Sequence, residues 1–115
     1  PTLLDFSAPE MVAKQITADK VMAGIRAEGQ RIRALGYDLD QCLIDLGETA
    51  EAKVLEHLRA KKWDCVLVGA GVRTNPNHLH LFEKVLNLVH EHAPSAHICF
   101  STSPNDSVDA IKRWT

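Results

Sequence analysis

The sequence predicts an α/β domain in which helices cover both faces of a parallel sheet. Cys65–Val68 and His97–Ser101 are apolar runs of strand length, and Tyr37–Ile44 is a third, less purely apolar one. Runs without a polar interruption are typical of strands buried on both faces. Stretches with helical periodicity separate the three runs, and strands that alternate with helices form parallel sheets with right-handed crossovers. We expect residues 1–115 to form one domain.

Helical periodicity predicts four helices, each with one apolar side. The first three cover about residues 17–35, 49–62 and 79–92. The last begins at Ser103 as its cap, with Asp106 three residues later in a variant of the capping box. The expected inward side chains of the first three helices are Val21, Ile25, Ile32 and Leu35, then Val54, Leu55 and Leu58, then Phe82, Val85, Leu86 and Val89.

The start of the chain leaves one choice open. A doubly wound sheet normally opens with its central strand, whereas here an irregular segment precedes the first helix. Either Thr2–Phe6 forms a short first strand, or the first strand lies upstream of Pro1. We expect the second, so that this chain lacks its first strand or has it truncated. An exposed strand edge would then drive self-association into a homo-oligomer.

Composition argues against several classes of partner. The formal net charge is −2, and the basic residues are scattered over expected helix surfaces, so we expect no nucleic-acid binding. The longest apolar runs fall far short of the roughly 20 residues that a bilayer span requires. No signal peptide is visible, and we therefore expect a cytoplasmic protein without a membrane partner.

The three cysteines, Cys42, Cys65 and Cys99, each fall in one of the three apolar strands. An odd number without a Cys-x-x-Cys pair is a poor disulfide framework and a poor zinc site, so we expect no metal. We expect buried, reduced thiols that act as small apolar residues, with catalysis as the alternative. None of the three lies at the sheet edge where a nucleophile would be needed.

A ligand site is expected beyond the carboxyl ends of the strands, because ligands of open α/β sheets bind there. One such end is followed by glycines and Arg73, the next by hydroxyl residues. Backbone N–H groups, hydroxyls and a guanidinium suit a phosphate or a carboxylate. The predicted ligand-binding residues are Gly69, Gly71, Arg73, Asn75, His78, Ser101, Thr102 and Ser103.

Two alternatives to this anion site stay open. In the first, Ser101–Ser103 only cap the last helix, and Arg73 pairs with Glu48 or Asp45. In the second, His78 or His80 acts as a general base, and the chain is an enzyme. The segment Gly69–Gly71 lacks the third glycine of a dinucleotide fingerprint, and the sequence identifies no cofactor.

The element order resembles the flavodoxin-like group, which includes response-regulator receiver domains; residues 63–110 carry this resemblance. A receiver has a phosphoacceptor aspartate where Gly69 or Ala70 stands, and a lysine where Ser101–Ser103 stands. The resemblance therefore implies the fold without phosphotransfer. A protein-interaction module that acts as a homodimer is our alternative to the leading hypothesis, the binding of a small anionic molecule with Arg73 as anchor.

Five short segments are similar to those of a small bacterial family. In that family a strand precedes the segment that matches Pro1, and the resemblance implies no activity. The segments are Asp5–Ser7, Val68–Arg73, Leu81–Glu83, Ala93-Pro94 and Arg113-Trp114.

Overall fold

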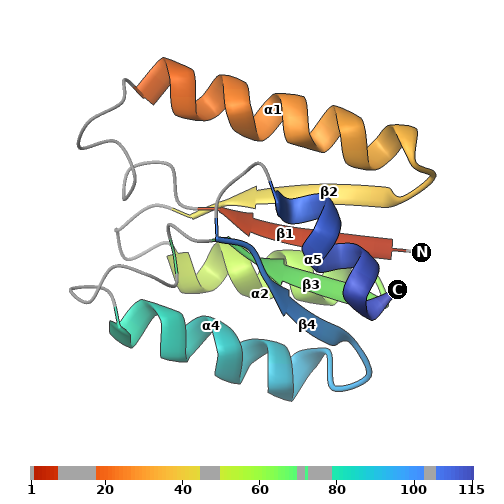
Figure 1. Cartoon of the computed structure of the whole chain (residues 1–115). Helices are drawn as coiled ribbons and strands as arrows, with labels where there is room; N and C mark the ends of the chain where they lie inside the picture. The colour runs from red at the N-terminus through yellow and green to blue at the C-terminus, as the bar shows by residue number, and fades with distance from the viewer. Residues whose placement is uncertain (1, 8–17, 45–49, 70–71, 73–78, 103–105) are drawn as a thin grey trace.

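The computed structural model describes residues 2–7, 18–44, 50–69, 72, 79–102 and 106–115. These residues form a four-stranded, all-parallel sheet of order β2-β1-β3-β4 (Figure 1). In chain order the elements are β1 (Thr2–Ser7), α1 (Ala18–Ala34), β2 (Asp38–Leu43), α2 (Ala50–Ala60), β3 (Cys65–Val68), α4 (Leu79–His92), β4 (His97–Phe100) and α5 (Ser107–Trp114).

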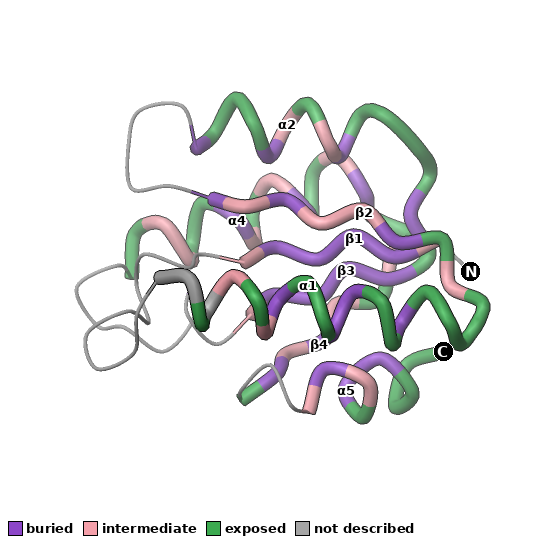
Figure 2. The backbone as a smooth tube through the Cα atoms, turned by 90° about the horizontal axis from the view of Figure 1, so that it is seen from above, coloured by how far each residue is buried: buried purple, intermediate pink, exposed green. Residues whose placement is uncertain are grey.

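Helices cover both faces of the sheet, as the sequence predicts. Figure 2 shows α1 and α5 on one side of the strands and α2 on the other, and α4 packs with α2. Each face has its own apolar core, because successive residues of a strand point to opposite sides. Leu4 and Val66 belong to the core under α2 and α4, whereas Leu3 and Leu67 belong to the core under α1 and α5. The expected three-layer, flavodoxin-like α/β class is therefore confirmed.

The central strand is β1, which settles the choice that the sequence left open. Thr2–Ser7 pairs in parallel with β2 on one side and with β3 on the other. Our preference for a central strand upstream of Pro1 is therefore wrong, because the described sheet already has its centre. The acidic Asp5 interrupts the apolar pattern of Leu3, Leu4 and Phe6 and so hides the strand. Against the five-strand order 2-1-3-4-5, the described residues lack the strand beside β4.

Two boundaries differ from the sequence prediction. Leu35 is 51% exposed because α1 ends at Ala34, and the chain turns at Gly36 with a φ of 98°. The last helix begins at Ser107, with Asp106 as its N-cap residue; residues 103–105, including the predicted cap Ser103, lie outside the described residues. The third helix covers 79–92 as predicted.

Trp63 is the largest fully buried side chain and belongs to the core under α2 and α4. Its exposed fraction is 2%, and its indole Nε1 donates a hydrogen bond to the carbonyl oxygen of His57 at 2.9 Å. The ammonium of Lys61 lies 5.5 Å from the ring centroid. Trp63 thus ties the end of α2 to the start of β3.

We expect Trp63→Ala to lower the free energy of unfolding by about 3–5 kcal/mol, since it leaves a large cavity and removes the indole donor. Chemical denaturation measures the change. Trp114→Ala is the matched control: Trp114 is 52% exposed, and its removal should cost less than about 1 kcal/mol. Equal losses in the two variants would contradict the assignment of Trp63 to the core.

Candidate binding groove at the β2 edge

Most of the site predicted from the sequence lies outside the described residues. Gly71, Arg73, Asn75, His78 and Ser103 belong to the ranges 70–71, 73–78 and 103–105. His80 is exposed in the first turn of α4. The members that the structure describes are Gly69, Ser101 and Thr102.

Gly69 lies where β3 ends against β1, as the sequence predicts for the carboxyl edge of the sheet. Its N–H donates to the carbonyl oxygen of Phe6 at 2.9 Å. A Cβ at this position would come within 3.1 Å of that oxygen and 3.8 Å of the Ser7 hydroxyl. The close approach of two backbones therefore accounts for a glycine here without a ligand.

Thr102 has its hydrogen-bond donors engaged by a carboxylate of the chain itself. The Thr102 N–H lies 3.0 and 3.2 Å from the two Asp106 carboxylate oxygens, and the Thr102 hydroxyl donates to one of them. Ser101, one residue earlier, is buried. An anion at Thr102 would have to displace Asp106, so at this residue the structural alternative describes the observed contacts.

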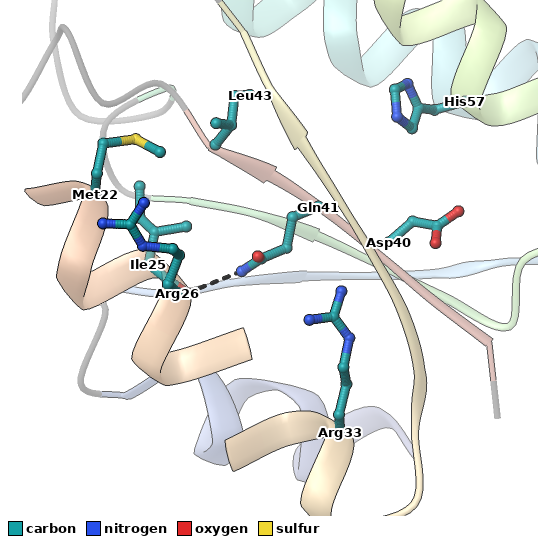
Figure 3. Close-up of a pocket in the computed structure, with 8 residues that line it drawn as sticks. All are labelled: Met22, Ile25, Arg26, Arg33, Asp40, Gln41, Leu43 and His57. Carbon is teal, nitrogen blue, oxygen red and sulfur yellow. Dashed lines mark hydrogen bonds between the residues drawn. The ribbon is translucent and has the colours of Figure 1, made fainter. Parts of the chain in front are cut away.

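A groove of about 490 Å³ runs along the outer edge of β2, away from the residues that the sequence predicts as a site (Figure 3). Its lining combines two arginines with apolar and polar side chains. We call it the β2 groove; its residues are Met22, Ile25, Arg26 and Arg33 of α1, Asp40, Gln41 and Leu43 of β2, and His57 of α2.

The β2 groove reaches both faces of one strand. Gln41 and Leu43 share a face with Leu39, which packs under α1, whereas Asp40 points to the opposite face with Cys42. Figure 3 shows Arg26 and Arg33 on the α1 side of β2 and His57 on the other side. A molecule in this groove would therefore lie against the strand edge itself.

The backbone of β2 presents hydrogen-bonding groups to this groove. The N–H of Ile44 donates to the Ser7 carbonyl at 2.7 Å, which fixes the even-numbered residues toward β1. In a parallel ladder the alternate residues Leu39, Gln41 and Leu43 then direct their N–H and C=O groups outward. Arg33 donates from a guanidinium nitrogen to the Leu39 carbonyl at 3.2 Å.

Positive charge dominates the α1 wall of the groove. Arg26 and Arg33 are seven residues apart, about two helical turns, and so lie on the same side of α1. Among the described residues Arg26 has no ion-pair partner. The one carboxylate of the lining, Asp40, lies 3.7 Å from the Lys61 ammonium, which also contacts Asp38 at 3.2 Å. The negative charge of Asp40 is thus partly neutralised by the Lys61 ammonium.

Gln41 connects the groove to α1. Its amide nitrogen donates to the Ile25 carbonyl at 2.9 Å. Helix α1 can approach this closely because residue 29 is glycine: a Cβ there would come within 2.8 Å of the Gln41 amide nitrogen. The sequence signals were the Arg26/Arg33 spacing and a polar Gln41 inside a strand, and neither reveals an open strand edge without the sheet order.

A pair of buried carboxyl groups lies beneath α1, next to the groove. Burial raises the pKa of Asp5 to about 6, opposed by hydrogen bonds from Gln41 and Ser7 and assisted by the nearby Glu28. One Glu28 oxygen pairs with Arg31 at 3.0 Å, and the other is buried and has no hydrogen-bond partner among the residues that the structure describes. Asp5 itself is 5% exposed, on the same face of β1 as Leu3.

The cysteines are free and buried, as predicted. Cys65 and Cys99 lie in contact beneath α5, with their sulfurs 3.5 Å apart, and the hydrogen bond between them lowers the pKa of Cys65 and raises that of Cys99. Burial raises the pKa of Cys42 on the opposite face to about 11. Buried thiols of this kind are poor nucleophiles.

Within the described part of the chain, no group of three or more His, Cys, Asp or Glu side chains could hold a metal ion. The described helices also include none with the length and apolar character needed to cross a bilayer. Comparisons with known protein families, with curated proteins and with solved structures found no match. The fold class and the geometry of the β2 groove are therefore the basis for a functional proposal.

Asp5 should make the free energy of unfolding decrease as pH rises. Its pKa in the folded state lies above the ordinary value of 3.8, so the folded state binds this proton more tightly than the unfolded state. Its contribution is fully present below about pH 4 and is lost as pH rises through about 6, by roughly 2–3 kcal/mol. Asp5→Asn should remove this loss, which denaturation at pH 4, 5, 6 and 7 measures.

Asp64→Asn is the control of opposite sign. Hydrogen bonds from the Thr2 N–H and then from its hydroxyl lower the pKa of Asp64, which is fully exposed. The Asp64 carboxylate stabilises the folded state at pH values above its pKa in the unfolded chain, and the wild type loses this contribution on acidification. Asp64→Asn should therefore be less stable than the wild type at neutral pH and equally stable at low pH. An Asp5→Asn profile parallel to that of the wild type would show that Asp5 is not the titrating group.

Proposed function

We propose that the protein is a binding module for an anionic ligand and that the β2 groove receives it. The observation that supports this most directly is the pair Arg26 and Arg33, two turns apart on one side of α1 and both lining the groove. Guanidinium groups bind carboxylates and phosphates in a two-pronged geometry. Apolar side chains at the Met22 and Leu43 end would contact the uncharged part of the ligand.

The proposed ligand is an anion, as expected from the sequence, but the arginines proposed to bind it are Arg26 and Arg33 instead of Arg73. At the carboxyl edge of the sheet, the Thr102 donors are engaged by Asp106, which weakens the case for an anion there. Arg73 remains a predicted anchor outside the described residues. The two locations make different predictions for arginine variants, and one experiment separates them.

Thermal-shift measurements with inorganic phosphate, citrate and nucleotides test the proposal. A ligand at about ten times its dissociation constant should add about 1.4 kcal/mol, a rise in Tm of roughly 5 °C. The rise should disappear in Arg26→Ala and persist in Arg59→Ala, an exposed arginine of α2 that does not line the groove. Loss in Arg73→Ala alone would place the site at the carboxyl edge of the sheet, and no rise with any anion would reject anion binding.

The alternative function is protein interaction through a homodimer, and the edge at β4 favours it. The N–H of His97 donates to the Asp64 carbonyl, so the backbone groups of Ile98 face away from the sheet. Trp114 is 52% exposed beside this edge, with its ring 5.8 Å from that of His97. Sedimentation of the wild type and of Trp114→Ala tests this alternative. A concentration-dependent dimer that is lost in the variant would support it. A wild-type protein that stays monomeric up to about 100 µM, roughly the range of transient contacts, would oppose it.

Membership of the small bacterial family and a cytoplasmic location belong to the same proposal. The family rests on the segments Asp5–Ser7 and Val68–Arg73 and on the others that carry the resemblance, and the location rests on the lack of a visible signal peptide in the sequence. Both are compatible with a binding module that carries no membrane-spanning helix among its described residues.

A further inference from the structure

We infer that the ligand of the β2 groove is an extended acidic peptide that pairs with β2 as an added strand; this rests on the proposed function, since it names the anionic ligand of the same groove. The inference begins from the shape of the groove. Its lining extends from Asp40 to Leu43 along β2 and from Met22 to Arg33 along α1, and it includes both faces of the strand, so the groove follows the strand edge. A compact anion on the α1 side would use only part of this lining.

The strand edge supplies the backbone partners that such a peptide requires. Gln41 and Leu43 direct their N–H and C=O groups into the groove, and the opposite edge of β2 is fully paired with β1. Extended peptides commonly bind proteins by adding a strand to an open sheet edge, where backbone hydrogen bonds provide affinity and side-chain contacts provide specificity. The edge is thus complementary to a backbone as well as to a charge.

The side chains around the edge select an alternating sequence. A peptide strand beside β2 would turn every second side chain toward α1, where Arg26 and Arg33 flank Gln41 in Figure 3. Acidic residues two positions apart would meet these guanidinium groups. The other side chains would face Asp40 and His57, where a further carboxylate would be repelled by Asp40. The favoured pattern is acidic residues at alternate positions with uncharged residues between them.

Arg33 has a second role in this arrangement. Its bond to the Leu39 carbonyl covers one of the outward acceptors of β2 and so hinders unselective strand pairing, the usual hazard of an open edge. A peptide carboxylate would compete for the same guanidinium and release the Leu39 carbonyl to the incoming strand. Acidic peptides would therefore free the Leu39 carbonyl for strand pairing, whereas with neutral peptides Arg33 would remain bonded to it.

Fluorescence anisotropy with a labelled peptide of alternating valine and glutamate tests the inference. We expect saturable binding to the wild type and at least roughly tenfold weaker binding of the lysine counterpart. Two further versions carry N-methyl groups on one or the other set of alternate backbone nitrogens, and the version methylated on the N–H groups that face β2 should also bind at least roughly tenfold more weakly. Arg26→Glu should reverse the charge preference toward the lysine peptide. Arg59→Glu, outside the groove on α2, is the matched control and should behave as the wild type.

The outcomes separate this inference from the proposed function. Equal binding of the glutamate peptide and its two N-methylated forms, methylated on either set of alternate nitrogens, would overturn strand pairing, as would the absence of peptide binding when phosphate or citrate still raises Tm through Arg26. In both cases anion binding by the groove would stand. Failure of every anion and every peptide would reject the proposed function together with the inference.

Discussion

The structure depends on the burial of β1 between two neighbouring strands and two layers of helices. This strand is hydrogen-bonded along both edges, and its side chains enter both cores: Leu3 under α1 and α5, and Leu4 and Phe6 under α2 and α4. All three are 0% exposed. Burial of large apolar side chains is the main favourable term in folding, and three of the six residues of β1 contribute such side chains to the two cores. The positions of β2 and β3, and of the helices above them, follow from this arrangement.

Asp5 is the exception within this strand and explains the local polar structure. A carboxyl group in the core is unfavourable unless it is protonated or hydrogen-bonded. Gln41 satisfies it from β2, and the same amide reaches the Ile25 carbonyl of α1. Gly29 allows the helix to lie close enough for that bond. This polar contact and the apolar packing of Ile32 thus hold α1 on the sheet, and the position of α1 in turn places Arg26 and Arg33 along the edge of β2.

The two edges of the sheet are protected in the same way by different helices. Arg33 of α1 donates to the Leu39 carbonyl of β2, and Arg113 of α5 donates to the Phe100 carbonyl of β4 at 3.3 Å. Each guanidinium covers one outward acceptor of an edge strand, which natural sheets need in order to avoid unwanted pairing. The edges differ in their surroundings: a groove with arginines adjoins β2, and the exposed ring of Trp114 adjoins β4.

The sequence by itself determined the fold class and three of the four strands. Apolar runs such as Cys65–Val68 and the helical period of 79–92 are local signals, and local signals are sufficient when both faces of an element are buried. The sequence left β1 as the less favoured of two alternatives because Asp5 breaks the apolar run, and the hydrogen bonds from Gln41 and Ser7 that accommodate this residue come from the tertiary structure. The sequence missed the β2 groove. Which strand lies at an edge, and which arginines lie beside it, follow from the order β2-β1-β3-β4, which long-range pairing decides.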